Sequence, residues 1–218
     1  IDLMDKHHYI GFKYLLTQRN IMDFKLLFED FPERIIPYDY DAYFSNPARF
    51  VMVTTNCLTG KAEYFEEKSS SKRVMDIVRA SSSLPFVSPI TYVDGVPMLD
   101  GGIADSIPVR YALSQGYERL VVILTRNKGY RKQNSEMRAA KVFYRKYPNL
   151  QKALSERNAV YNQTMDLIER LEDEGRITVI RPIRPVEVGR MEKDTAKLTM
   201  LYQEGYDIAR SLIACENA

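Results

Sequence analysis

The residues best placed to do chemistry are Asp100, Gly101 and Gly102, which follow a predicted β-hairpin. Glycine tolerates positive φ and lets the backbone approach another group closely, so this pair could aim the Asp100 carboxylate at a reacting partner with little steric cover. A carboxylate presented in this way can act as a general base. Asp-Gly pairs are also common turn formers, and the spacing alone leaves both interpretations open.

Other polar side chains near this loop have simpler interpretations. Asp105 could face the same site, but its position just before Pro108 favours capping of the next helix. The serines at 81–83 lie between a predicted helix and Pro85, without a G-x-S-x-G pattern or a neighbouring base, and we predict that they are turn residues. The sequence therefore offers a candidate base without a candidate nucleophile beside it.

The glycines and histidines exclude several familiar catalytic arrangements. No two of the 10 glycines are spaced as in G-x-S-x-G or G-x-G-x-x-G, and none begins a G-K-[ST] phosphate loop. The 2 histidines, His7 and His8, are adjacent, so their side chains point in different directions and cannot both serve one site. Hydrolytic chemistry in this chain is therefore expected to use a base other than histidine.

The composition is that of a globular protein. With 218 residues, 45% of them hydrophobic, we expect one large domain or one domain with a small appendage. A net charge of +2 does not support general nucleic-acid binding, and no apolar run approaches the length of a transmembrane helix. Cys57 and Cys215 are too few for a disulfide framework or a cysteine zinc site, and we expect no metal and no cofactor. Their scarcity fits a reducing compartment, which predicts a cytoplasmic protein.

The segment RNKGYRK (126–132) carries four basic side chains in seven positions. Such a segment could touch anionic lipid head groups at a membrane surface. A solvated loop is the alternative, and it is the interpretation that we favour.

Hydrophobic patterning predicts alternating helices and strands. Helices are expected within 5–30 and at 71–83, 109–116, 135–148, 149–175 and 194–214, and strands at 50–56, 62–65, 119–125 and 177–185. Asp94-Gly95 should form a two-residue type I′ turn between the two strands of a hairpin at 90–99, and Pro97 indicates that this hairpin lies at a sheet edge. The strand–helix–strand order after it predicts a parallel α/β sheet with 119–125 buried.

Two further expectations concern organisation. The three prolines within 31–47 predict a long packed connection there. The composition changes after residue 126, so we predict an α/β part at 1–130 and a helix-rich region at 131–218. The helix at 149–175 has an apolar stripe that needs cover, which predicts that this region packs back on the α/β part.

With these elements in place, the sequence resembles the patatin-like phospholipases, a family of serine lipid acyl hydrolases. DGGIADSIPV (100–109) is similar to their D-G-[GA] box, and FVMVTTNCLTGKAEYF (50–65) is similar to the strand–T-x-x-x-x-G–strand segment before that box. RASSSLPFVSP (79–89) resembles the A-[ST]-x-x-x-P run, and PVRYALSQGYERLVVILT (108–125) resembles the helix and strand that follow the box. The resemblance covers roughly residues 5 to 130, and the tail resembles the C-terminal region of a bacterial subgroup.

The resemblance implies a patatin-like, mostly parallel sheet flanked by helices, with the N-terminal portion missing and a helix-rich C-terminal region. It implies a catalytic Ser-Asp dyad in which Asp100 supplies the base and Gly101 and Gly102 form the active-site loop. The serine, on a G-x-S-x-G elbow, and the glycine-rich oxyanion loop would then lie upstream of residue 1, and this chain alone would be inactive. The implied substrate is a lipid or other carboxylic ester, with transient contact at a membrane surface.

Two alternatives to this enzyme remain open. The chain could belong to a non-catalytic patatin-like scaffold that binds a membrane or a protein partner. Alternatively, D-G-G could be only the exit of a hairpin, in which case replacing Asp100 would leave activity intact.

Overall fold

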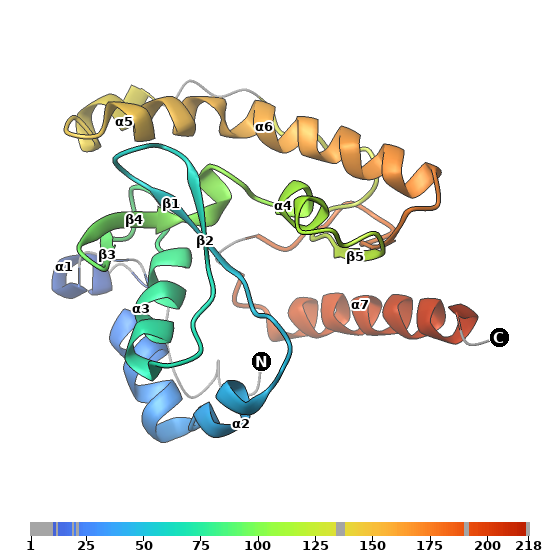
Figure 1. The fold of residues 1–218 in the computed structure, drawn as a ribbon, viewed down its shortest axis with the longest axis horizontal. Helices are drawn as coiled ribbons and strands as arrows, with labels where there is room; N and C mark the ends of the chain where they lie inside the picture. The colour runs from blue at the N-terminus through green and yellow to red at the C-terminus, as the bar shows by residue number, and fades with distance from the viewer. Residues whose placement is uncertain are drawn as a thin grey trace. The chain divides into compact units, whose positions relative to one another are not determined.

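A computed structural model describes residues 11–216 except positions 12, 19, 21, 134–137 and 190–191 (Figure 1). The chain forms two compact units. The first contains the described residues of Tyr9–Ile107 and Gln133–Tyr161, and the second contains those of Pro108–Lys132 and Asn162–Ala218. Helix α6 (Pro148–Asp173) contributes its first part to one unit and its second part to the other.

The first unit is built on a four-stranded sheet. Its strands are β1 (Met52–Asn56), β2 (Ala62–Phe65), β3 (Thr91–Val93) and β4 (Val96–Asp100), in the order β2-β1-β4-β3. Every pairing is antiparallel. A short turn joins β1 to β2 and the predicted hairpin joins β3 to β4, while β1 and β4 pair across the middle of the sheet. The parallel pairing that we predicted therefore does not extend to this sheet.

The hairpin turn is confirmed, and the hairpin lies at one edge of the sheet as predicted, with β3 as the outer strand. Asp94 and Gly95 both have positive φ, 51° and 79°, as a type I′ turn requires. However, β4 lies between β3 and β1. Pro97 is tolerated there because the pairing of β4 with β1 begins one residue later, at Met98. The ladder therefore needs no N–H from the proline.

Helices cover both faces of this sheet (Figure 1). Adjacent residues of a strand point to opposite faces, and Met98 and Leu99 accordingly belong to two different cores. On the Met98 face, α3 (Ser71–Ser81) buries one side of the predicted helix, including Val74 and Ile77. On the Leu99 face lie α5 (Arg138–Phe143) and the first part of α6.

The core on the Leu99 face joins the C-terminal helices to the D-G-G loop. Leu99 and Ile103, on either side of that loop, pack with residues of α5 and α6 that include Leu150 and Leu154. The predicted stripe of α6 is confirmed, because its apolar side chains are buried: Leu150, Leu154, Tyr161, Met165, Ile168 and Leu171. A side chain at position 60 would overlap the backbone of Asn149, so Gly60 is needed where the β1–β2 turn meets α6.

The N-terminal segment contains more helix than predicted. It forms α1 (Lys13–Gln18), the π-helix η1 (Leu26–Ile35) and α2 (Tyr40–Ser45), while residues 5–10 of the predicted helical region lie outside the described part. The expected connection at 31–47 thus includes the end of η1 and all of α2. The α2 helix begins because the Asp39 carboxylate accepts a hydrogen bond from the Ala42 amide, 2.8 Å away.

The second unit contains α4 (Val109–Ser114), β5 (Leu120–Ile123), β6 (Ile177–Ile180) and α7 (Thr195–Glu216). β5 and β6 pair in parallel, which confirms the parallel sheet expected for this region. β5 is less buried than predicted, since Val121 and Ile123 are 60% and 72% exposed. The α/β class with a helix-rich C-terminal region is confirmed, and the domain boundary near residue 130 stays a prediction.

Candidate active site

Asp100 lies at the junction of two elements. It is the last residue of β4 and the residue before η2, a single 3₁₀ turn at Gly101–Ile103. Its carboxylate Oδ1 accepts a hydrogen bond from the Gly102 amide at 2.6 Å, so the side chain folds back over the start of the turn. The residue is half-buried, which suits a group that must be both oriented and reachable.

The backbone of Asp100 is held on both sides. Its N–H donates to the carbonyl oxygen of Ser83 at 2.9 Å, and its carbonyl accepts from the Thr55 hydroxyl at 2.9 Å. The same hydroxyl oxygen accepts from the Ala104 amide at 3.2 Å. Because Thr55 is fully buried, water does not compete for these bonds. The main chain around Asp100 is therefore fixed to β1 and to the end of α3.

Glycine is favoured at positions 101 and 102 for different steric reasons. A Cβ at position 101 would overlap the carbonyl oxygen of Val53, so Gly101 allows the turn to lie directly against β1. A Cβ at position 102 would lie 2.9 Å from Asp100 Oδ1, so Gly102 leaves room for the carboxylate. The first clash is with backbone and the second with a side chain that can rotate. This difference accounts for a D-G-[GA] pattern in which only the second glycine is replaceable.

The predicted capping role of Asp105 is wrong. Its Oδ2 accepts a hydrogen bond from the Tyr64 hydroxyl of β2 at 2.6 Å, while α4 begins at Val109, after Pro108, without a side-chain cap. Asp105 thus ties the segment after η2 to β2.

The serines at 81–83 are used locally, as predicted for residues at a helix end. Ser82 and Ser83 donate their hydroxyl protons to the carbonyls of Val78 and Arg79, at 2.9 and 2.8 Å. Ser83 is fully buried, and its hydroxyl also lies 2.9 Å from that of Thr91. These contacts stabilise the turn whose carbonyl holds Asp100.

The remaining candidate groups for nucleophilic or metal chemistry contribute little. Burial raises the pKa of the Cys57 thiol to about 12, so it remains protonated and serves as core packing. Within the described residues, no cluster of His, Cys, Asp and Glu could hold a metal ion. His7, His8 and the side chain of Cys215 lie outside the described part.

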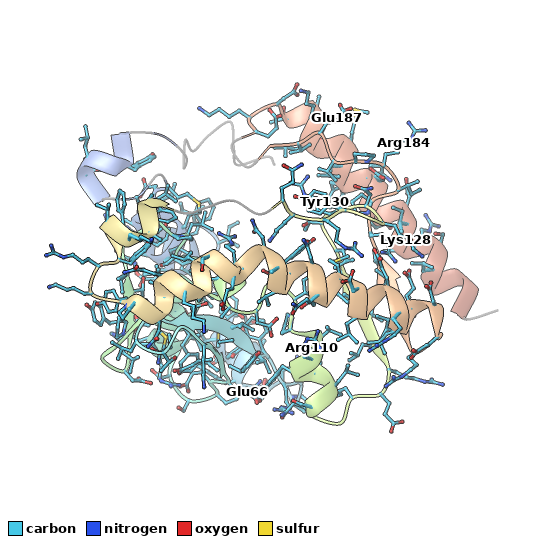
Figure 2. All side chains as sticks on the ribbon, turned by 90° about the horizontal axis from the view of Figure 1, so that it is seen from above. Glu66, Arg110, Lys128, Tyr130, Arg184 and Glu187 are labelled. Carbon is cyan, nitrogen blue, oxygen red and sulfur yellow. The ribbon has the colours of Figure 1, made fainter. Side chains whose placement is uncertain are left out.

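Two basic side chains of the loop at 126–132 pair with carboxylates of α6, and Figure 2 labels one of them, Lys128. Arg131 pairs with Asp166 and Glu169, each at 2.7 Å, and lowers the pKa of the Glu169 carboxyl. Lys128 lies 3.7 Å from Glu172 and 3.5 Å from the neighbouring aspartate. The interpretation as a solvated loop therefore agrees with its ion pairs. None of the helices in the described part combines the length and apolarity required to span a bilayer.

The comparisons with known proteins agree with this geometry. Residues 3–113, just over half of the chain, match the model of the patatin-like phospholipases. The chain therefore belongs to the patatin-like phospholipase family, as the D-G-G box and the segment with Thr55 and Gly60 predicted. Residues 147–214 match a domain of unknown function, DUF6363.

A curated relative matches over a shorter stretch. It is Uncharacterized protein YjjU from Escherichia coli strain K12, which is 48% identical over 52 residues. These residues are 23% of this chain and 15% of YjjU, so the chain spans a small part of that relative.

Sequence reasoning missed the residues that hold Asp100 in place. Thr55 and Gly60 are the two ends of the T-x-x-x-x-G segment, and the structure gives each a role. The Thr55 hydroxyl anchors the D-G-G loop, and the absence of a side chain at Gly60 allows α6 to approach the β1–β2 turn. A threonine in an otherwise buried strand was the available signal, because a buried hydroxyl needs a hydrogen-bond partner. The part played by the Ser83 carbonyl leaves no signature in side-chain types.

Proposed function

We propose that the natural protein containing this chain hydrolyses carboxylic esters of lipids through a Ser-Asp dyad, with Asp100 as the general base. The nucleophilic serine and the oxyanion loop are supplied from sequence upstream of residue 1. The substrate class follows from the family, and the cytoplasmic location remains part of the proposal because it rests on the two cysteines. A lipid substrate in a bilayer also requires transient contact with the membrane surface.

The anchoring of Asp100 is the observation that supports this proposal. A free aspartate is a weak base, with a pKa of about 3.9, so it must be held against the serine hydroxyl to be useful. The Ser83 carbonyl and the Thr55 hydroxyl fix its backbone, and the Gly102 amide orients its carboxylate. These contacts hold the carboxylate in one orientation, as a positioned general base requires.

The test uses the natural full-length protein and a short-chain p-nitrophenyl ester. We expect Asp100→Asn and Asp100→Ala to lower turnover at least ~100-fold, in the range for loss of a positioned general base. Asp105→Asn is the matched control: it lies five residues away, binds Tyr64, and should retain activity within a few-fold. Thermal melts establish that the Asp100 variants stay folded.

Three outcomes would overturn the assignment. Activity above about a tenth of wild type in folded Asp100→Asn would make D-G-G a structural turn. Failure of the wild-type protein to react with a serine-directed fluorophosphonate would favour the non-catalytic scaffold. The 218-residue chain alone should show no turnover above a heat-denatured control, and turnover lost on replacing a serine at 81–83 would place the nucleophile within this chain.

A further inference from the structure

Helix α5 and the turn after it present apolar side chains to solvent. Val142 and Phe143 are 77% and 66% exposed, although residues of these types are normally buried. They line a hollow of about 510 Å³ formed by residues 141–143 and 145–147. A surface of this kind commonly marks an interaction site.

Three of these six lining residues are basic. Lys141, Arg145 and Lys146 are all exposed, and the segment contains no acidic residue. Within the described part of the chain, none of the three forms an ion pair, in contrast to Lys128 and Arg131 of the basic loop. Their charge is therefore available to an external anion.

The exposed side chains are supported by packing against more buried residues of the same unit. The Phe143 ring packs edge-on against Phe86, with centroids 5.6 Å apart. Phe86 has a φ of 71°, which is costly for a bulky residue, and its amide donates to the buried Tyr144 hydroxyl at 2.8 Å. Tyr144 in turn belongs to the core that contains Leu99. The surface of 141–147 is thus fixed to the unit that carries Asp100.

From this combination we propose that residues 141–147 are a docking site for an anionic phospholipid surface. An aromatic ring inserts at the level of the head groups, while the long lysine and arginine side chains reach the phosphates beside it. Lysine is depleted in the centres of protein–protein interfaces, which makes a protein partner a poorer match for this composition. The inference rests on the proposed function for its lipid substrate and names the surface that would contact the membrane.

Co-sedimentation of the 218-residue chain with vesicles tests the site. We expect binding to vesicles of phosphatidylcholine with phosphatidylglycerol and much weaker binding to phosphatidylcholine alone. Each cation should contribute about fivefold to the partition coefficient. The triple variant Lys141→Glu, Arg145→Glu, Lys146→Glu should therefore lose at least about 100-fold. The matched control reverses Arg126, Lys128 and Arg131, with the same change in net charge, and should lose about threefold or less.

A second measurement does not depend on the charge variants. The chain has no tryptophan, so Phe143→Trp introduces a single reporter whose emission should shift to the blue on anionic vesicles. Circular dichroism establishes that each variant is folded. Equal binding to both kinds of vesicle, an unshifted emission from the Phe143→Trp variant, or a greater loss in the control than in the 141–147 variant would overturn the proposal. Concentration-dependent self-association abolished by Phe143→Ser would assign the surface to a second protein chain instead.

The two proposals can fail separately. Vesicle binding requires no catalysis, and a soluble short-chain ester requires no membrane. If the unsubstituted chain fails to bind anionic vesicles while the full-length protein still hydrolyses the soluble ester, only the docking site is overturned.

Discussion

The D-G-G loop and the loop at 126–132 each follow a strand and each present charged side chains, yet they are held in different ways. Around Asp100, the contacts are made by backbone groups, a buried hydroxyl and a glycine lying against β1. In the basic loop, Arg131 and Lys128 reach across to carboxylates of α6 through long, partly exposed side chains.

This difference predicts how the stability of each loop responds to amino-acid substitution. Backbone hydrogen bonds and close steric approach leave no alternative geometry, so a substitution there must displace the chain. Exposed ion pairs are weak and can re-form with other partners or with water. We therefore expect the first loop to be intolerant and the second to be tolerant.

The largest effect should come from the core that supports the D-G-G loop. Leu150→Ala removes a fully buried side chain that packs with Leu99 and Ile103, and should cost about 3 kcal/mol of stability. Urea unfolding followed by circular dichroism measures the loss. Val160→Ala on the same helix, at a position 37% exposed, is the control and should cost less than about 1 kcal/mol. Equal losses at the two positions would show that α6 does not support this loop.

Gly101→Ala tests the close approach to β1. The new Cβ would meet the carbonyl oxygen of Val53, and relieving this overlap should cost roughly 2–3 kcal/mol. Gly205→Ala is a control of opposite sign: it lies within α7 with open space around it, and alanine should stabilise the helix by up to about 1 kcal/mol. If Gly101→Ala unfolds at the wild-type urea concentration, the steric account of this glycine is wrong.

Thr55→Val separates the buried hydroxyl from the shape of the side chain. Valine fills the same volume but leaves the Asp100 carbonyl and the Ala104 amide each without one buried partner, at a cost of about 2 kcal/mol. Thr55→Ser keeps the hydroxyl and should lose about 1 kcal/mol or less. In the full-length protein, serine should also restore turnover that valine lowers. Equal behaviour of the two variants would mean that the hydroxyl does not position Asp100.

The parts of this site that could be predicted from the sequence are local. The type I′ turn follows from Asp94 and Gly95 because both central residues must adopt positive φ. Asp100 was identified for a similar reason, since two glycines beside a carboxylate permit a close approach of the backbone. The apolar stripe of α6 is likewise a property of one helix.

The parts that could not be predicted depend on contacts between distant residues. Thr55 and Asp100 are 45 positions apart, and Tyr64 and Asp105 are 41 apart, so only the strand order brings each pair together. The same order places Pro97 inside the sheet. Sequence patterning shows which residues prefer a strand but not which strand becomes the neighbour.

Glu67 lies between the two cases, because it forms an ion pair, as the basic loop does, but is buried, as Thr55 is. Hydrogen bonds from Ser69 and Arg73 hold its pKa at about 2, well below its usual value. A depressed pKa in the folded state stabilises the protein above the unfolded-state value, about 4.3, and this contribution is lost as the pH falls toward 2. The melting temperature should therefore fall across this range. Glu67→Gln should flatten that part of the profile, and an unchanged slope would contradict the assignment.

The smallest effect is expected in the basic loop, at Arg131→Ala. The guanidinium bridges Asp166 and Glu169 but is 31% exposed, and such pairs contribute about 0–1 kcal/mol. Truncation leaves Glu169 its hydrogen bond from the Gly129 amide, so the carboxylate is not stranded. The loss should shrink further between roughly 0.05 and 0.5 M salt, because screening weakens the pairs. A double-mutant cycle with Glu169→Gln isolates the pairwise energy. A salt-independent loss as large as that from Thr55→Val would show that this loop is held as firmly as the one carrying Asp100, and would remove the distinction between them.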